Sequence, residues 1–149
     1  MKKLLIICIV LCVSTNILYA QNTVIKGRIV DDNLETLPHV SIIINDTVKI
    51  GKTDLNGFFQ VDIPISVKKL SFESVGLDPA TVRLTDKCDE VEVVMILRGN
   101  YDFITLKRVD KLRMKIFKKL PILHKKAFEK GIFKTDKACY TQEFISYYK

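Results

Sequence analysis

The fold is decided by the stretch Thr53-Asp54-Leu55-Asn56-Gly57-Phe58-Phe59, which follows the earlier stretch Gly27-Arg28-Ile29-Val30-Asp31. Asp54 can accept a backbone N–H two residues further on, and Gly57 can take a positive φ, so a tight turn is predicted. A strand then starts, in which one phenylalanine ring should enter the core and the other cover the outer face. Asp54 and Asn56 also offer oxygen to calcium, but calcium takes about six to eight oxygens. We therefore interpret the turn as structural.

Short strands are predicted on both sides of this turn. No segment before Gly99 shows a convincing 3.6-residue period, and turns rich in Asp, Asn, Gly and Pro separate the apolar runs. The seven candidate strands are residues 23–30, 40–44, 48–53, 58–63, 70–74, 81–84 and 91–96. Short strands at this regular spacing predict a mainly β domain, built as a two-sheet sandwich.

Residues 1–20 have the parts of a secretory signal peptide. Lys2 and Lys3 form the charged end, and an unbroken apolar stretch follows that is too short to span a bilayer. Small Ala20 suits the residue before the cut. The alternatives are an uncleaved anchor and a lipoprotein, although neither Cys8 nor Cys12 lies in the context expected of a lipidated cysteine.

Charge is divided unevenly along the chain. Residues 22–97 carry 8 basic and 12 acidic residues, a net of −4, whereas residues 98–149 carry 14 basic and 5 acidic residues, a net of +9. This step predicts three parts: a signal peptide at 1–20, a β half at 21–97 and a basic tail at 98–149. Because the chain carries an export signal and no aromatic-rich basic platform, we expect no nucleic-acid partner.

The basic tail begins with a helical pattern. Apolar residues recur there at three- and four-residue steps, at Leu106, Val109, Leu112, Ile116 and Leu120. Pro121 should end this helix and suit the first turn of a second, over residues 122–130, which Gly131 closes. Residues 135–149 are rich in aromatic side chains and should form an added strand or an extended arm.

The polar side of these helices is cationic. Its members are Lys107, Arg108, Lys111, Arg113, Lys115, Lys118, Lys119, Lys125 and Lys126. Three interpretations stay open: the apolar stripe docks on the acidic β half, the cationic residues contact anionic lipid or lipopolysaccharide, or they contact an envelope protein.

The β half resembles the carboxypeptidase-regulatory-like domain, a transthyretin-like sandwich common in exported proteins of the Bacteroidota. The resemblance rests on residues 25–31, 37–42, 51–59 and 70–76, which are similar to the family patterns G-x-V-x-D, P-L-x-x-A-x-V, G-T-x-T-D-x-x-G-x-F and L-x-F-S-x-x-G-Y. Ile29, Lys52 and Leu77 depart from these patterns mildly. The resemblance implies a seven-stranded transthyretin-like or Ig-like sandwich without catalytic residues. Such domains lie beside carboxypeptidase catalytic units or at the front of TonB-dependent outer-membrane transporters.

Two further features bear on the compartment. Cys88 and Cys139 lie outside the signal peptide, and an oxidising envelope would allow a disulfide between them; the alternative is two reduced cysteines. Thr47 lies in Asp46-Thr47-Val48, which resembles the short O-glycosylation motif of exported Bacteroidota proteins, and Asn45-Asp46-Thr47 is a formal N-glycosylation sequon. A turn at a strand end explains these residues equally well.

The residues do not suggest catalysis. His39 and His124 are the only histidines, and a zinc peptidase site needs two or three ligands together with a general base. A G-x-S-x-G elbow is also absent from the sequence. We therefore expect no enzyme activity, no metal and no cofactor.

Together these features predict a non-enzymatic, exported cell-envelope protein, periplasmic or associated with the outer membrane. Its β half would be a binding or assembly module, with an envelope protein as partner, in outer-membrane transport or surface complexes. The alternative is a peripheral membrane-surface protein that binds anionic lipid or lipopolysaccharide through its basic amphipathic helices. A third hypothesis is regulation of a hydrolase in trans.

Overall fold

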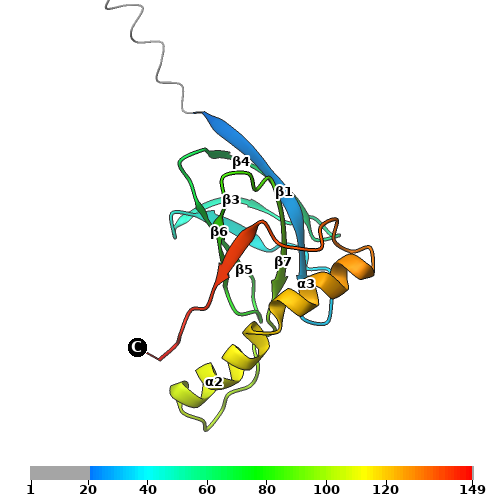
Figure 1. Ribbon diagram of the computed structural model, residues 1–149. Helices are drawn as coiled ribbons and strands as arrows, with labels where there is room; N and C mark the ends of the chain where they lie inside the picture. The colour runs from blue at the N-terminus through cyan, green and yellow to red at the C-terminus, as the bar shows by residue number, and fades with distance from the viewer. Residues whose placement is uncertain (1–20, 149) are drawn as a thin grey trace, which may run out of the picture.

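The computed structural model describes residues 21–148, which form a mainly β structure with two sheets and two helices (Figure 1). The strands are β1 (Asn22–Asp31), β2 (Ser41–Ile44), β3 (Val48–Lys52), β4 (Phe58–Pro64), β5 (Lys69–Glu73), β6 (Ala80–Leu84), β7 (Glu90–Met95) and β8 (Tyr140–Glu143). The helices are α2 (Leu106–Phe117) and α3 (Leu120–Glu129). The expected β architecture is confirmed. The predicted signal peptide, with Cys8 and Cys12, lies outside the described residues.

Two sheets enclose one core. The three-stranded sheet has the order β4-β1-β7, with β1 antiparallel to β4 and parallel to β7, and the five-stranded sheet has the order β3-β2-β5-β6-β8. Ile29 and Val93 of the first sheet and Phe72 and Val82 of the second are fully buried in the same cluster. Burial of these apolar side chains is the main stabilising term of the fold.

The strand count is corrected from seven to eight. Each predicted strand overlaps an observed one, and the eighth, β8, comes from the basic tail. It pairs antiparallel with β6, from Thr81 opposite Glu143 to Leu84 opposite Tyr140. Of the two expectations for residues 135–149, the added strand is confirmed for Tyr140–Glu143. The basic tail therefore completes the five-stranded sheet.

The predicted turn after β3 has the expected chemistry. The Oδ1 atom of Asp54 accepts the backbone N–H groups of Asn56 and Phe58, each at 2.8 Å, and Gly57 has φ of 77°. Phe59 is buried and Phe58 is 41% exposed, so the phenylalanines divide between the two faces as predicted. The carboxylate of Asp54 thus closes a backbone reversal.

The earlier motif is structural as well. A Cβ atom at Gly27 would lie 1.8 Å from the carbonyl oxygen of Val91, so only glycine permits the close approach of β1 and β7. Buried Asp31 closes the turn after β1, because its Oδ1 atom accepts the N–H groups of Asn33 at 2.9 Å and Glu35 at 2.8 Å. Both motifs thus set backbone geometry.

Helix α3 packs against the three-stranded sheet beside β7, whereas α2 extends away from it (Figure 1). A second apolar cluster joins Val30 and Val94 of that sheet to Leu120, Ala127 and Phe133 of the basic tail. As predicted, Pro121 lies in the first turn of the second helix and a positive-φ Gly131 follows its end. Leu120 and Ile116 of the predicted apolar stripe join this cluster, whereas Leu106 and Leu112 are 54% and 39% exposed. The first of the three interpretations therefore holds only for the C-terminal end of the stripe. Neither helix within residues 21–148 is long and apolar enough to cross a membrane.

Candidate functional site

A cavity of about 570 Å³ lies between the two helices and β8, and we call it the tail cavity. Its volume is within the range of small-molecule sites, about 300–1,000 Å³. Val94 of β7, the two helices and the segment leading into β8 provide its walls. The lining residues are Val94, Met114, Phe117, Lys118, Leu120, Pro121, His124, Asp136, Lys137, Ala138, Tyr140, Thr141 and Gln142.

His124 is the buried ionisable side chain of this lining. Its Nε2 atom lies 3.1 Å from the carbonyl oxygen of Thr135, and since a carbonyl only accepts, Nε2 carries the proton. Burial lowers the pKa of His124, and this effect outweighs the opposing influence of the Thr135 carbonyl and the Glu92 charge. The imidazole is therefore neutral at neutral pH, and its ring packs against Phe133 with centroids 4.9 Å apart.

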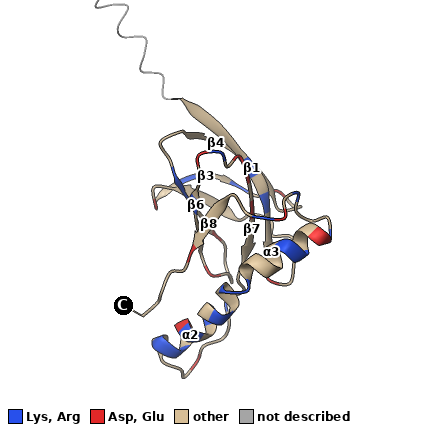
Figure 2. Cartoon of the chain, in the orientation of Figure 1, with Lys and Arg blue, Asp and Glu red and all other residues tan. Residues whose placement is uncertain are grey.

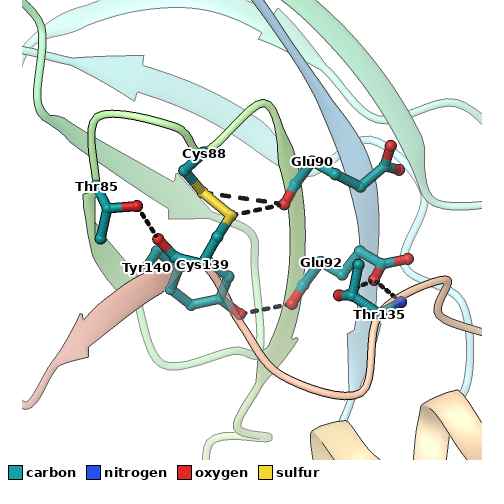
Figure 3. Close-up of a disulfide and its surroundings, with 7 residues drawn as sticks. All are labelled: Thr85, Cys88, Glu90, Glu92, Thr135, Cys139 and Tyr140. Carbon is teal, nitrogen blue, oxygen red and sulfur yellow. Dashed lines mark hydrogen bonds between the residues drawn. A yellow bond between two sulfur atoms is a disulfide. The ribbon is translucent and has the colours of Figure 1, made fainter.

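A disulfide joins the tail side of the cavity to the β half. Cys88, in the loop before β7, and Cys139, just before β8, are bonded with a Cα–Cα distance of 5.3 Å (Figure 3). Of the two alternatives for these cysteines, the structure has the bridge. Thr85 adds a hydrogen bond from its hydroxyl to the Cys139 carbonyl, 2.7 Å long. The hydroxyl of Tyr140 donates to the carbonyl of Glu92, and burial raises the Tyr140 pKa well above its usual range.

We call a contact that holds the basic tail on the β half a fastening; the disulfide is the first, and the carboxylate of Glu92 is the second. Only 2% of this residue is exposed, and its two oxygens accept three hydrogen bonds from the loop after α3. The donors are the N–H of Lys134 at 2.6 Å, the N–H of Thr135 at 3.0 Å and the Thr135 hydroxyl at 2.8 Å. A buried carboxylate that is satisfied in this way holds the loop in place, and losing it would leave partly buried donors without their acceptor.

Arg113 forms the third fastening, and its position corrects the sequence-based prediction. It was assigned to the cationic surface but is 4% exposed. Its Nε donates to Asp78 at 2.7 Å, and its Nη1 donates to Asp110 at 2.8 Å and to the carbonyl of Ile145 at 2.9 Å. The guanidinium carbon lies 3.7 Å from the centroid of the Tyr147 ring. The prediction was wrong because Asp78, brought close by the fold, and the C-terminal segment enclose the charge.

Asp110 and Tyr147 titrate away from their usual ranges in this cluster. Desolvation acts to raise the pKa of Asp110. The hydrogen bonds that it accepts from Ser146, from the Tyr147 and Tyr148 backbone and from Arg113 have the larger, opposite effect, so its pKa lies well below the ordinary value. Burial, followed by the hydrogen bond to Asp78, raises the pKa of Tyr147. Asp78, Asp110, Arg113 and Tyr147, called the Arg113 cluster, therefore keep an ionised carboxylate at Asp110 and a neutral phenol at neutral pH.

The other predicted cations are exposed, and the basic residues of α2 and α3 are blue in Figure 2. Within residues 21–148 none of them forms an ion pair; they are Lys107, Arg108, Lys111, Lys115, Lys118, Lys119, Lys125 and Lys126. Positions 107, 111, 115 and 118 follow the helical repeat, on the side opposite buried Val109 and Arg113. We call these four the cationic stripe. Their charges are available to an external anion.

An exposed apolar tip precedes this stripe. Phe103 is fully exposed, with φ of 63°, and Leu106 at the start of α2 is 54% exposed. Positive φ is rare for an aromatic residue, and here the backbone presents the ring to solvent. Leu106 was predicted to belong to the docking stripe, whereas Phe103 was not predicted as a site residue; its only local signal is an apolar residue in a short polar connection.

Thr47 and His39 lie on the surface of the β half. Thr47 is exposed in the β2–β3 turn, where Asn45 and Asp46 have φ of 51° and 60°, and its hydroxyl donates to the Asn45 carbonyl at 3.3 Å. His39 is exposed in the loop before β2. Among the described residues, no cluster of three or more His, Cys, Asp and Glu side chains has a metal-binding arrangement.

Comparison with known proteins assigns no family to this site. No protein-family model matches the chain, and no curated protein matches it at a significant level.

Proposed function

We propose that this protein is an exported, non-enzymatic binding module of the cell envelope. In this proposal the two sheets are a transthyretin-like or Ig-like sandwich of the carboxypeptidase-regulatory type, and the basic tail builds the binding site. The observation that carries the proposal is the tail cavity, which is walled by β7, both helices and the segment that leads into β8. Concave, mostly apolar sites of this size are typical of ligand-binding proteins.

The way the basic tail is held favours binding. The disulfide, Glu92 and the Arg113 cluster each fix a different part of residues 134–148 to the β half. A preformed site loses little conformational entropy when it binds, so the three fastenings raise affinity without adding contacts. The buried Glu92, Asp78 and Arg113 side chains use their polar atoms in these internal contacts, which supports a structural role for them.

Export is supported by two independent features. Residues 1–20 have the pattern of a signal peptide, and the chain carries a disulfide, which forms and persists in the envelope and is rare in the cytoplasm. We therefore place the protein in the periplasm or at the outer membrane.

Site-specific photocrosslinking in living cells tests this function. A small aliphatic diazirine residue at Ala138, which lines the tail cavity and would not fill it, should give adducts in the envelope fraction. The same residue at Thr47, exposed in the β2–β3 turn, is the matched control. Recovery of the protein in the cytoplasm with free thiols, or no adducts at Ala138 beyond those at Thr47, would overturn the proposal.

A second candidate function is binding to an anionic membrane surface, which the Phe103 tip and the cationic stripe favour. An exposed aromatic residue can enter the interface while nearby lysines meet lipid headgroups, each contributing about 1 kcal/mol near an anionic surface. Co-sedimentation with anionic and with neutral vesicles tests this candidate. Replacing both Phe103 and Leu106 by alanine should reduce pelleting with anionic vesicles, and equal pelleting with both vesicle types would exclude this function.

A further inference from the structure

We propose that the tail cavity binds a single-chain anionic amphiphile, a free long-chain fatty acid, with its chain inside and its carboxylate at Lys118 and Lys137. This inference rests on the proposed function, because it takes the tail cavity as the binding site and names the chemical class of the ligand.

The interior of the tail cavity suits an alkyl chain. Val94 lies at the sheet, and Met114, Phe117, Leu120 and Pro121 line the helical side. Met114 and Phe117 are half-buried, so part of their apolar surface faces the cavity and contacts water when it is empty. A chain that covers this surface gains the hydrophobic free energy of burial.

Three polar side chains of the lining, those of Tyr140, Gln142 and His124, already donate hydrogen bonds to the protein. The hydroxyl of Tyr140 donates to the Glu92 carbonyl, the side-chain amide of Gln142 donates to the Val94 carbonyl at 3.4 Å, and His124 donates to the Thr135 carbonyl. A sugar or a peptide would bring many polar groups into the cavity and leave them with few partners. A chain without polar groups has no such requirement, so the lining favours an aliphatic ligand.

Charge at the edge of the cavity selects an anion. Lys118 follows the last residue of α2 and Lys137 lies in the segment before β8; both are exposed, and neither forms an ion pair within residues 21–148. Asp136 also lines the cavity, so these three side chains carry a net charge of +1. His124 stays neutral because burial lowers its pKa, and adds no charge inside. One carboxylate therefore matches both the charge and its location.

Fluorescence displacement on the exported, unreduced protein tests this inference. A fluorescent fatty acid is bound first and then displaced by dodecanoate, tetradecanoate or hexadecanoate, each kept monomeric. Because a buried methylene contributes about 0.8 kcal/mol, each one added should tighten binding about fourfold. A neutral detergent with the same chain should bind more weakly than dodecanoate.

Variants locate the site. Lys118→Ala and Lys137→Ala should each weaken dodecanoate binding by up to about fivefold, as for a solvent-exposed ion pair, whereas Lys125→Ala on α3 outside the lining should not. Ala138→Trp should abolish binding by filling the cavity. Met114→Gln, which keeps the size of the side chain but makes the lining polar, gives a second reading if Ala138→Trp disturbs folding.

The outcomes separate this inference from the proposed function. No displacement by any fatty acid, or displacement unchanged in Met114→Gln and in the two lysine variants, would overturn the amphiphile. Binding only to vesicles and not to monomeric dodecanoate would also overturn it and would favour the membrane candidate. Adducts at Ala138 in cells would, in those cases, still support a binding module with a different ligand.

Discussion

The β half and the basic tail are held in place by different kinds of interaction. The β half is stabilised by strand pairing and by one large core, which contains Ile29, Phe72 and Val82. Its turns close locally through hydrogen bonds to Asp31 and Asp54. The basic tail instead depends on one short strand, an apolar patch and three fastenings to distant residues. The β half therefore supplies the scaffold, whereas long-range contacts between single residues shape the tail cavity.

The largest effect should come from the common core. Phe72→Ala removes a fully buried ring and should lower the free energy of unfolding by about 3–5 kcal/mol, with loss of both regions in one transition. Urea denaturation followed by circular dichroism measures this change. Phe58→Ala, at a 41% exposed position, is the control and should change stability much less. Helices that persist after the sheets have melted would contradict a shared unit.

Loss of the disulfide should act chiefly on the basic tail. In the double variant Cys88→Ser/Cys139→Ser, the loss of a link across 51 residues should cost up to about 4 kcal/mol of stability, largely through the unfolded chain. Hydrogen exchange should show faster exchange over residues 134–148, while β2 and β5 stay protected. Reduced wild-type protein should behave like the variant. Unchanged exchange in that segment would show that the bridge does not hold it.

Substitution of buried Arg113 should affect stability far more than substitution of Lys107, an exposed cation on the same helix. Arg113→Ala leaves Asp78 without its closest cation and should destabilise the protein by about 3 kcal/mol, whereas Lys107→Ala should change stability by less than about 0.5 kcal/mol. Thermal unfolding of the two variants, measured side by side, decides this. Similar melting temperatures would mean that the buried position of Arg113 has no energetic consequence.

The smallest expected effect is a loss of folding stability at acidic pH. Because the pKa of Asp110 is lowered in the folded protein, its contribution to stability is present above the unfolded pKa and is lost as pH falls below about 4. Asp110→Asn should therefore be less stable than wild type at neutral pH, and the difference should shrink as the pH falls below about 4. Urea midpoints over this pH range measure it, with Asp62→Asn on β4 as the control. A difference that is independent of pH would contradict the assignment.

The sequence predicted the β half well because its signals are local. Strand alternation, the Asp54–Gly57 turn and the split between Phe58 and Phe59 each depend on neighbouring residues, and the structure has them all. The period of three to four residues likewise placed both helices and the start of the second at Pro121.

The candidate site was predicted only in part. A Cys88–Cys139 bridge was one of two alternatives that the cysteines and the compartment left open. The tail cavity in addition needs β8 to pair with β6, which no local pattern specifies. Arg113 and Lys111 also look alike in sequence, since both are cations on one amphipathic helix. The partner that separates them, Asp78, lies more than thirty residues earlier and becomes adjacent only through folding.

The most direct test is a thiol titration of the protein recovered from the cell envelope, denatured without reductant. We propose that the basic tail is fixed to the β half in an oxidising compartment, where it builds the tail cavity. We expect no reactive thiol from Cys88 or Cys139 until reductant is added, and mass spectrometry of the labelled peptides identifies each cysteine. Labelling of both cysteines before reduction would contradict the claim.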